Sequence, residues 1–130
     1  MTPSRSAEEV LILAVERDPY VRKLEHFFLH RAGYRVEFAS DGLQGLERAR
    51  ILRPPVVVTE IMLPRLDGLG VCRALKSDPA TKSIAVIVFS AISAEGRALE
   101  AGADAFLPKP LDDARLVETV AKLLQKVRGE

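Results

Sequence analysis

The chain has 130 residues, which is enough for one domain with a single hydrophobic core and too few for two. Its 19 Lys and Arg residues and 18 Asp and Glu residues leave a formal net charge of +1, so charge alone gives no reason to expect binding to nucleic acid or to an anionic membrane. The single cysteine, Cys72, excludes an internal disulfide and a cysteine-rich metal site within this sequence.

The sequence is predicted to form one domain behind a short leader. Residues 1–9 are polar and lack the apolar stretch of a targeting signal, so we expect a flexible N-terminal leader followed by a domain over residues 10–128. The apolar run from Val10 to Val15 has the length of a strand and not of a membrane span. A cytoplasmic protein is therefore the expectation.

Five apolar runs of strand length alternate with five helix-like segments along the chain. This alternation predicts an α/β protein in which helices cover both faces of a parallel sheet. The predicted strands are residues 10–15, 35–39, 56–60, 84–90 and 104–107. The predicted helices begin after Asp18, at residues 40–42, near Leu66, at Ala94, and at Asp112 or Asp113.

The spacing of apolar residues predicts which face of each helix is buried. The first helix is expected to start with Asp18 as N-cap and Pro19 in its first turn. Its predicted buried residues are Val21, Leu24, Phe28 and Ala32. Those of the later helices are Leu43, Leu46 and Ala49, then Leu69, Cys72 and Leu75, and finally Leu116, Val120, Leu123 and Leu124.

The most informative segment runs from Val56 to Gly68 and reads VVVTEIMLPRLDG. Its β-branched run predicts a strand buried on both faces, and this strand delivers one acid, Glu60, to its carboxyl end. In an open α/β sheet this edge is where ligands bind. The segment resembles the phosphoacceptor segment of bacterial response-regulator receiver domains, which typically reads D-(I/x)-M-L-P-x-(M/L)-D-G. It has glutamate in place of the aspartate that takes phosphate from a histidine kinase in that family.

The resemblance extends from Val10 to about Val127. It identifies the chain as an atypical, chemotaxis-receiver-like domain of a two-component system that lacks the phosphoacceptor aspartate. It implies a flavodoxin-like (βα)5 fold, a doubly wound five-stranded parallel sheet with strand order 2-1-3-4-5. Periodicity alone does not fix the strand order, so the order rests on the resemblance.

The resemblance also assigns the positions of the pocket. They are Glu60 for the phosphoacceptor, Glu16 and Arg17 for the acidic pair, Ser90 and Phe106 for the switch residues, and Lys109 for the conserved lysine. In active relatives the switch residues move toward the phosphoryl group. Without such a group, ordinary local packing of Ser90 and Phe106 is an equal alternative.

The charges at these positions differ from those of a working receiver, where Mg²⁺ neutralises three carboxylates and one lysine. Here Glu16 and Glu60 are set against Arg17 and Lys109, which balances the charge without a metal. A guanidinium also repels a divalent ion, by on the order of 4 kcal/mol per unit-charge pair at about 4 Å and an effective dielectric near 20. We therefore expect no cofactor, with Mg²⁺ binding lost or weak. Glu60 is expected to pair with Lys109, Arg17 or both.

Two other interpretations of the pocket stay open. The fold could be retained around a pocket whose charges are merely solvated. Alternatively, the domain could still accept phosphate or bind metal through Glu16 and Glu60 in a histidine-kinase phosphorelay. The longer glutamate side chain argues against phosphate transfer, because it moves the carboxylate by about one bond from the near-attack position.

Two other groups of polar residues are predicted to have no functional role. His26 and His30 lie four residues apart on one face of the first helix, but no third ligand is evident. They are predicted to be partly exposed helix histidines and not a metal site. The basic residues Arg48, Arg50 and Arg53 lack interleaved aromatics, so they are predicted to form a solvated helix face.

These observations favour a protein-interaction module in signal transduction that is not an enzyme and has no catalytic residue. Its expected partners are proteins, either a histidine kinase or a downstream effector, with neither nucleic acid nor membrane. In relatives the fourth helix, fifth strand and fifth helix form the output and dimerisation face, so a homodimer through this face is a further expectation.

The segment between Ser90 and Ala101 is about three residues shorter than is usual in receiver domains, which is nearly one helical turn. This difference indicates either an altered partner surface or a harmlessly shortened loop.

Overall fold

Five parallel strands form the centre of the computed structural model, which describes residues 9–127. The strands are β1 (Leu11–Val15), β2 (Arg35–Ala39), β3 (Val56–Thr59), β4 (Ala85–Ser90) and β5 (Ala105–Pro108). They pair in the order β2-β1-β3-β4-β5, and every pairing is parallel. The predicted fold class and strand order are confirmed.

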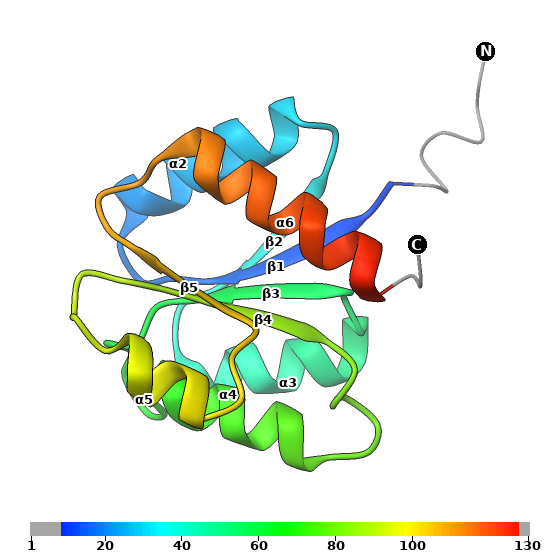
Figure 1. The fold of residues 1–130 in the computed structure, drawn as a ribbon, viewed down its shortest axis with the longest axis vertical. Helices are drawn as coiled ribbons and strands as arrows, with labels where there is room; N and C mark the ends of the chain where they lie inside the picture. Colours follow the sequence, from blue (N-terminus) through cyan, green and yellow to red (C-terminus); the bar gives the residue numbers. More distant parts are fainter. Residues whose placement is uncertain (1–8, 128–130) are drawn as a thin grey trace.

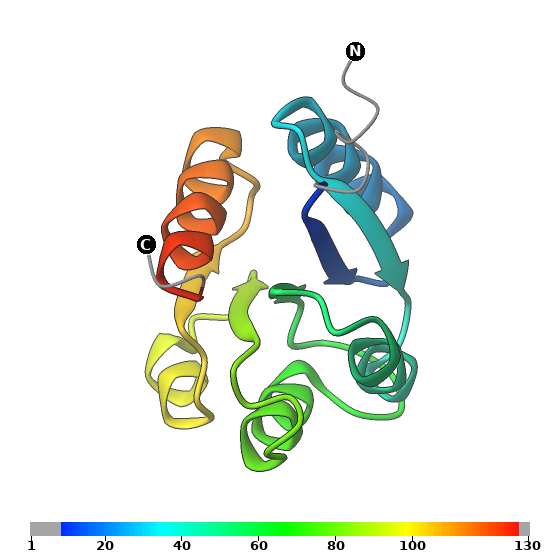
Figure 2. The ribbon, with the colours of Figure 1, turned by 90° about the vertical axis from the view of Figure 1, so that its right-hand side faces the viewer.

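Helices cover both faces of this sheet. They are α2 (Pro19–Arg31), α3 (Gly42–Leu52), α4 (Gly68–Ser77), α5 (Glu95–Glu100) and α6 (Asp113–Val127). Figure 1 shows α2 and α6 on one face of the sheet and α3, α4 and α5 on the other. Figure 2, turned by 90°, shows the same two helical layers with the sheet between them. Strands with near-continuous apolar runs require covering on both faces.

The two faces of the sheet carry separate hydrophobic cores. Successive side chains of a strand point to opposite faces, so neighbours in sequence enter different cores. Leu13 and Val57 lie in the core formed with α3, α4 and α5, whereas Ile12 and Val56 lie in the core formed with α2 and α6. The edge strand β2 is partly exposed, as its alternating sequence predicted.

Aspartate side chains cap the first turns of α2, α3 and α4. Asp18 accepts a hydrogen bond at 2.9 Å from a backbone N–H in the first turn of α2, which confirms the predicted start of this helix. Asp41 and Asp67 cap α3 and α4 in the same way. Since Asp67 is the cap, α4 begins at Gly68 and not near Leu66 as the sequence predicted.

Burial on α2 differs from the prediction. The buried residues of this helix are Glu25 and Leu29. The residues expected there are half-buried or, for the last, exposed: Val21, Leu24, Phe28 and Ala32. The apolar pattern predicted that Glu25 is exposed to solvent, because burying a charged carboxyl is costly unless it is paired or neutral. The buried faces predicted for α4 and α6 are confirmed.

Helix α3 approaches the sheet more closely than its apolar residues alone indicated. A Cβ added to Gly45 would lie 2.8 Å from a Val15 methyl carbon, so only a glycine permits this approach. Gly45, Leu46 and Ala49 are buried against the sheet, whereas Leu43, predicted to be buried, is 43% exposed.

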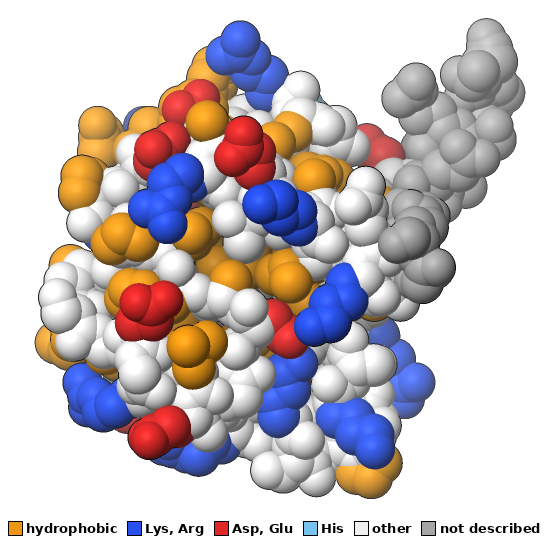
Figure 3. All heavy atoms as spheres, in the orientation of Figure 1, with side chains coloured by type: hydrophobic (Ala, Val, Ile, Leu, Met, Phe, Trp, Pro, Cys, Tyr) orange, Lys and Arg blue, Asp and Glu red, His pale blue; other side chains and the backbone are white. Residues whose placement is uncertain are grey.

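The surface of the domain carries both signs of charge. Figure 3 shows acidic and basic side chains interspersed over one face, in line with the small net charge. Among residues 9–127, no helix has the length and apolar character needed to cross a bilayer. The predicted leader, apart from Glu9, and residue 128 lie outside the described residues.

Candidate functional site

Three charged side chains meet at the carboxyl edge of the sheet. Glu16 directly follows β1, Glu60 directly follows β3, and Lys109 directly follows β5. Because β1 and β3 are neighbours, the two glutamates leave the sheet side by side. Backbone hydrogen bonds hold both in place: the Glu16 N–H donates to the Ala39 carbonyl at 2.9 Å, and the Glu60 N–H donates to the Val15 carbonyl at 3.0 Å.

The Lys109 ammonium bridges the two glutamates. Its Nζ lies 3.0 Å from Glu16 Oε1 and 2.8 Å from Glu60 Oε1. The side chains are largely buried, with exposed fractions of 2% for Glu16, 8% for Glu60 and 17% for Lys109. The Lys109 Nζ also lies 5.4 Å from the centroid of the Phe89 ring, a cation–π contact. We call this arrangement the Lys109 bridge, and it contains the predicted pairing of Glu60 with Lys109.

The other carboxylate oxygens of the bridge accept backbone hydrogen bonds. Glu16 Oε2 accepts from the Asp18 N–H at 3.1 Å. Glu60 Oε2 accepts from the N–H groups of Ile61 and Met62, the latter at 3.3 Å. Each oxygen of the two carboxylates therefore has a donor within the protein.

These contacts determine the charge of the pocket. Burial alone would raise the pKa of Glu60, but hydrogen bonds from Lys109, Ser90 and the Ile61 N–H outweigh burial and hold this pKa below its ordinary value. Burial alone would lower the pKa of Lys109, but hydrogen bonds to Glu60 and Glu16 outweigh it and raise this pKa. Both shifts favour the ionised forms, so Lys109 and Glu60 form an ion pair at neutral pH.

Arg17 does not take part in the bridge. Its side chain is exposed, and among residues 9–127 no ion pair or hydrogen bond joins it to Glu60. The prediction that Arg17 neutralises the pocket is therefore wrong. Successive side chains of an extended chain point in opposite directions, so when Glu16 turns into the pocket Arg17 turns to solvent. Two carboxylates then share one ammonium, which leaves the bridge with a net charge of −1.

The two predicted switch residues lie in different environments. Ser90 is buried at the end of β4, where its hydroxyl hydrogen bonds to Glu60 and accepts from the Ile92 N–H at 3.2 Å. Phe106 is half-buried on β5 and packs against the core formed with α3, α4 and α5. The structure thus brings Ser90 to the bridge, whereas the contacts of Phe106 are with the core.

The residues of the bridge do not fit Mg²⁺ as they are arranged. Mg²⁺ requires near-octahedral oxygen ligands at about 2.0–2.1 Å. Here an ammonium lies between the two carboxylates, and their other oxygens face backbone N–H groups. Within residues 9–127, no group of three or more His, Cys, Asp or Glu side chains could hold a metal ion.

A buried acid that the sequence did not single out lies near the bridge. Glu25, on α2, is 1% exposed, and its Oε1 has no hydrogen-bond partner in the described part of the chain. Burial raises the pKa of Glu25 to about 8; the charges of Glu16 and Glu60 add to this rise, and those of Lys109 and Arg22 oppose it. The sequence feature that could have indicated the burial of Glu25 is its position one helical turn before Leu29, on the same face of the helix.

The other polar groups lie apart from the bridge. His26 and His30 are exposed on α2, and their rings stack with centroids 5.2 Å apart. Arg48 and Arg50 form surface ion pairs with acidic residues at 3.7 and 3.8 Å. Arg53 is the C-cap of α3. Exposed histidines and solvated arginines are what the sequence predicted here.

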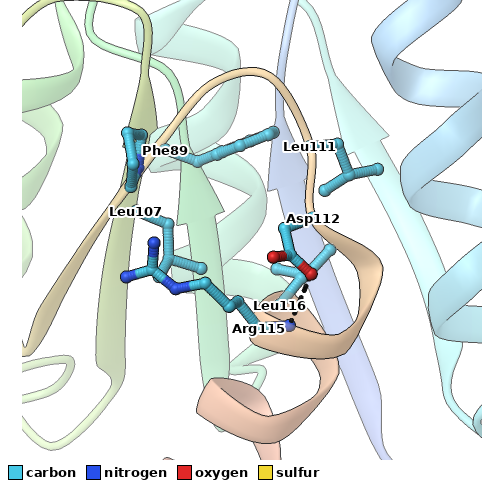
Figure 4. Close-up of a pocket in the computed structure, with 7 residues that line it drawn as sticks. Phe89, Leu107, Leu111, Asp112, Arg115 and Leu116 are labelled. Carbon is cyan, nitrogen blue, oxygen red and sulfur yellow. Dashed lines mark hydrogen bonds between the residues drawn. The ribbon is translucent and has the colours of Figure 1, made fainter.

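Phe89, which contacts Lys109, also lines a small pocket between β4, β5 and α6 (Figure 4). Leu107 and Leu116 form its apolar wall, and Asp112 lies at its side, accepting a hydrogen bond from the Arg115 N–H at 3.3 Å. Its cavity volume is about 10 Å³, room for one water molecule at most. This pocket is too small for an organic ligand.

Comparison with known proteins identifies a family. The family model for the response regulator receiver domain matches residues 12–121. The response regulator MprA of Mycobacterium leprae is 40% identical over 120 residues, and the transcriptional regulatory protein CseB of Streptomyces coelicolor is 36% identical over 121 residues. Both matches cover 92% of this chain but 53% and 51% of the relatives, so the chain spans about half the length of the curated relatives it matches.

Solved structures agree with this fold. The signal receiver domain of a signal transduction histidine kinase from Syntrophus aciditrophicus matches with a TM-score of 0.85 and 32% identity, covering 91% of this chain and 92% of that one. The chemotaxis response regulator CheY4 of Vibrio cholerae matches with a TM-score of 0.82, covering 88% of this chain and 98% of its own. Its identity of 24% shows similarity of fold alone.

Proposed function

Because this chain belongs to the response regulator receiver family, we propose that it acts as an atypical receiver in two-component signalling, held in one state without phosphate or Mg²⁺. One observation carries the proposal: the Lys109 ammonium already contacts both glutamates at the carboxyl edge of the sheet. Phosphoryl transfer requires cationic groups that are free to neutralise the incoming phosphoryl oxygens. Here the lysine of the pocket is engaged by the protein itself.

Glu60 supplies part of what a phosphoryl group would supply. A phosphoryl group carries about −1.5 to −2 charge and three acceptor oxygens. Glu60 carries a single charge, and its two oxygens accept from Lys109 and from two backbone N–H groups. On this proposal, Glu60 is a partial and permanent substitute for the phosphorylated aspartate of other receivers.

The domain is proposed to act through protein partners and not as an enzyme. These partners are a histidine kinase, a downstream effector, or a second copy bound through α5, β5 and α6. The relatives named above are about twice as long as this chain. The proposal that neither nucleic acid nor a membrane is bound therefore covers these 130 residues only. A domain over residues 10–128 and a cytoplasmic location are parts of the same proposal.

Phosphate acceptance or metal binding at Glu60, within a histidine-kinase phosphorelay, is the alternative. It is favoured by the low pKa of Glu60, because a carboxylate nucleophile must be ionised. Against it, both oxygens of Glu60 are already hydrogen bonded. An in-line attack needs an oxygen that is free to lie roughly 3–3.5 Å from phosphorus.

Intact mass after incubation with acetyl phosphate and Mg²⁺ separates the two functions. We expect the wild-type chain to gain no phosphoryl group. The double variant R17D/E60D, which restores the acids of an ordinary receiver, is expected to gain one, and an ordinary receiver treated in parallel shows that the donor is active. A gain of one phosphoryl group by the wild type that is absent from E60Q would replace the proposal with its alternative.

A further inference from the structure

Glu25 is a buried acid to which the contacts of the pocket assign no role. Its side chain lies on the buried face of α2 and is 1% exposed, and its Oε1 has no hydrogen-bond partner in the part of the chain that the structure describes. A carboxylate with an unpaired oxygen in this environment would lose its hydration without any replacement, which is strongly unfavourable. The burial of Glu25 and its unpaired oxygen therefore favour a neutral carboxyl, with a proton bound, in the folded protein.

Four charged groups act on this carboxyl. Glu16, Glu60 and Lys109 follow β1, β3 and β5, and Arg22 lies about one turn earlier on α2 itself. The strand β2 and the helix α6 also pack against α2, but none of their charged side chains within residues 9–127 acts on Glu25. Its charged neighbours are therefore the members of the Lys109 bridge and one arginine.

We propose that Glu25 is the proton-binding site of this pocket, and that its bound proton keeps the Lys109 bridge intact. The inference rests on the proposed function only in that it names a regulation of the same pocket. Deprotonation breaks the O–H bond of the Glu25 carboxyl, releases the proton to solvent and leaves the bonding electron pair on the oxygen. The carboxyls of Glu16, Glu60 and Glu25 together with Lys109 then go from a net charge of −1 to −2.

An ionised Glu25 would add a third carboxylate to the charges around the one ammonium. Lys109 has three N–H donors, and two of them already serve Glu16 and Glu60. Repulsion between the ionised Glu25 and the two acids that Lys109 pairs loosens the contacts of the bridge. Since the pKa of Glu25 is about 8, the bridge is held at neutral pH and loosened in mildly alkaline solution.

An NMR titration of the whole chain from about pH 5 to about pH 10 tests this coupling. The side-chain carboxyl carbon of Glu25 reports the proton itself. The amides of Asp18 and Met62 report the two arms of the bridge, because they donate to Glu16 and Glu60 respectively. We expect the carboxyl to titrate near pH 8 and both amides to shift with the same midpoint.

Two variants complete the experiment. The variant E25Q keeps the size of the side chain but has no titratable carboxyl. In this variant the amides of Asp18 and Met62 are expected to lose the transition near pH 8. The matched control is E47Q, an exposed glutamate on α3, which should leave the transition unchanged.

Three results would overturn the proposal: a Glu25 carboxyl that titrates near its ordinary value of 4.5, amides that shift equally in E25Q, or a titrating Glu25 with unmoved amides. The first is measured on the wild type, so poor folding of a variant cannot hide it. The titration uses no partner, phosphate donor or metal. If the intact-mass experiment showed phosphorylation of Glu60, it would refute the proposed function. The outcome of the NMR titration would still decide the role of Glu25 independently.

Discussion

The Lys109 ammonium lies 2.8 Å from Glu60 Oε1, and this contact joins the end of β5 to the end of β3. The strand β4 separates these two strands in the sheet, so no backbone ladder connects them directly. Both side chains are largely buried, and removal of Lys109 would leave the Glu60 carboxylate without its cation. The contact is thus a structural link as well as the main electrostatic feature of the pocket.

The variant K109M is expected to lower the free energy of unfolding by about 3 kcal/mol, because it leaves the buried glutamates Glu16 and Glu60 without their cation. This is the low end of the range for breaking a buried pair, since Lys109 is 17% exposed. Urea unfolding measures the change. The control K122M, at an exposed position of α6, should stay within about 0.5 kcal/mol of the wild type. Equal losses in both variants would contradict the buried bridge.

The stability of the domain in acid should depend on Glu60. Its pKa is held below the ordinary value of 4.5, so near that pH the folded state binds fewer protons than the unfolded state. The stabilisation by Glu60 is present above pH 4.5 and is lost as the pH falls through the folded pKa. The variant E60Q lacks this ionisation, and its unfolding midpoint should fall less steeply with acid than that of the wild type. Parallel slopes would be evidence against the low pKa.

Arg17 is expected to be dispensable for the stability of the pocket. Its side chain is exposed, so R17A should change the free energy of unfolding by less than about 0.5 kcal/mol. The amides of Asp18 and Met62, which donate to the two glutamates, should report an unchanged bridge in this variant. A loss of stability as large as that of K109M would show that Arg17 shares the role of the lysine.

The backbone at Glu60 depends on a close approach of α4. A Cβ added to Gly68 would lie 1.9 Å from the Glu60 carbonyl oxygen, so G68A must push the helix and the strand end apart. We expect a loss of roughly 1–3 kcal/mol or more in unfolding free energy. Gly96, on α5, is the matched control because an added Cβ there meets nothing within 4 Å. G96A should be neutral or stabilising by up to about 1 kcal/mol, and similar losses in both would argue against the close approach.

Local patterns predicted most of the fold, because its elements are locally specified. The β-branched run that begins at Val56 and the cap at Asp18 favour the same strand and helix in isolation as in the domain. Strand order is a property of the whole chain, and it came from the family resemblance. The predicted start of α4 was too early in the chain, because Asp67 was not recognised as the N-cap of this helix.

The sequence predicted most of the residues that belong to the candidate site, but it predicted only some of the contacts between them. The Lys109–Glu60 pair follows from the topology, which brings the ends of β3 and β5 to one edge. Arg17 turns to solvent because side chains alternate along the extended chain after β1, an alternation that the prediction did not apply beyond the end of the strand. Glu25 was missed because hydropathy patterns treat an acid as solvent-facing, whereas a bound proton allows its burial.

A Mg²⁺ titration followed through the backbone amides of Asp18 and Met62 tests most directly the central claim, that Lys109 takes the place of a metal ion between Glu16 and Glu60. We predict no saturable shift of either amide at millimolar Mg²⁺. Saturable shifts of both amides in the wild type would contradict the claim, because they would show that the ion displaces the lysine from the two carboxylates.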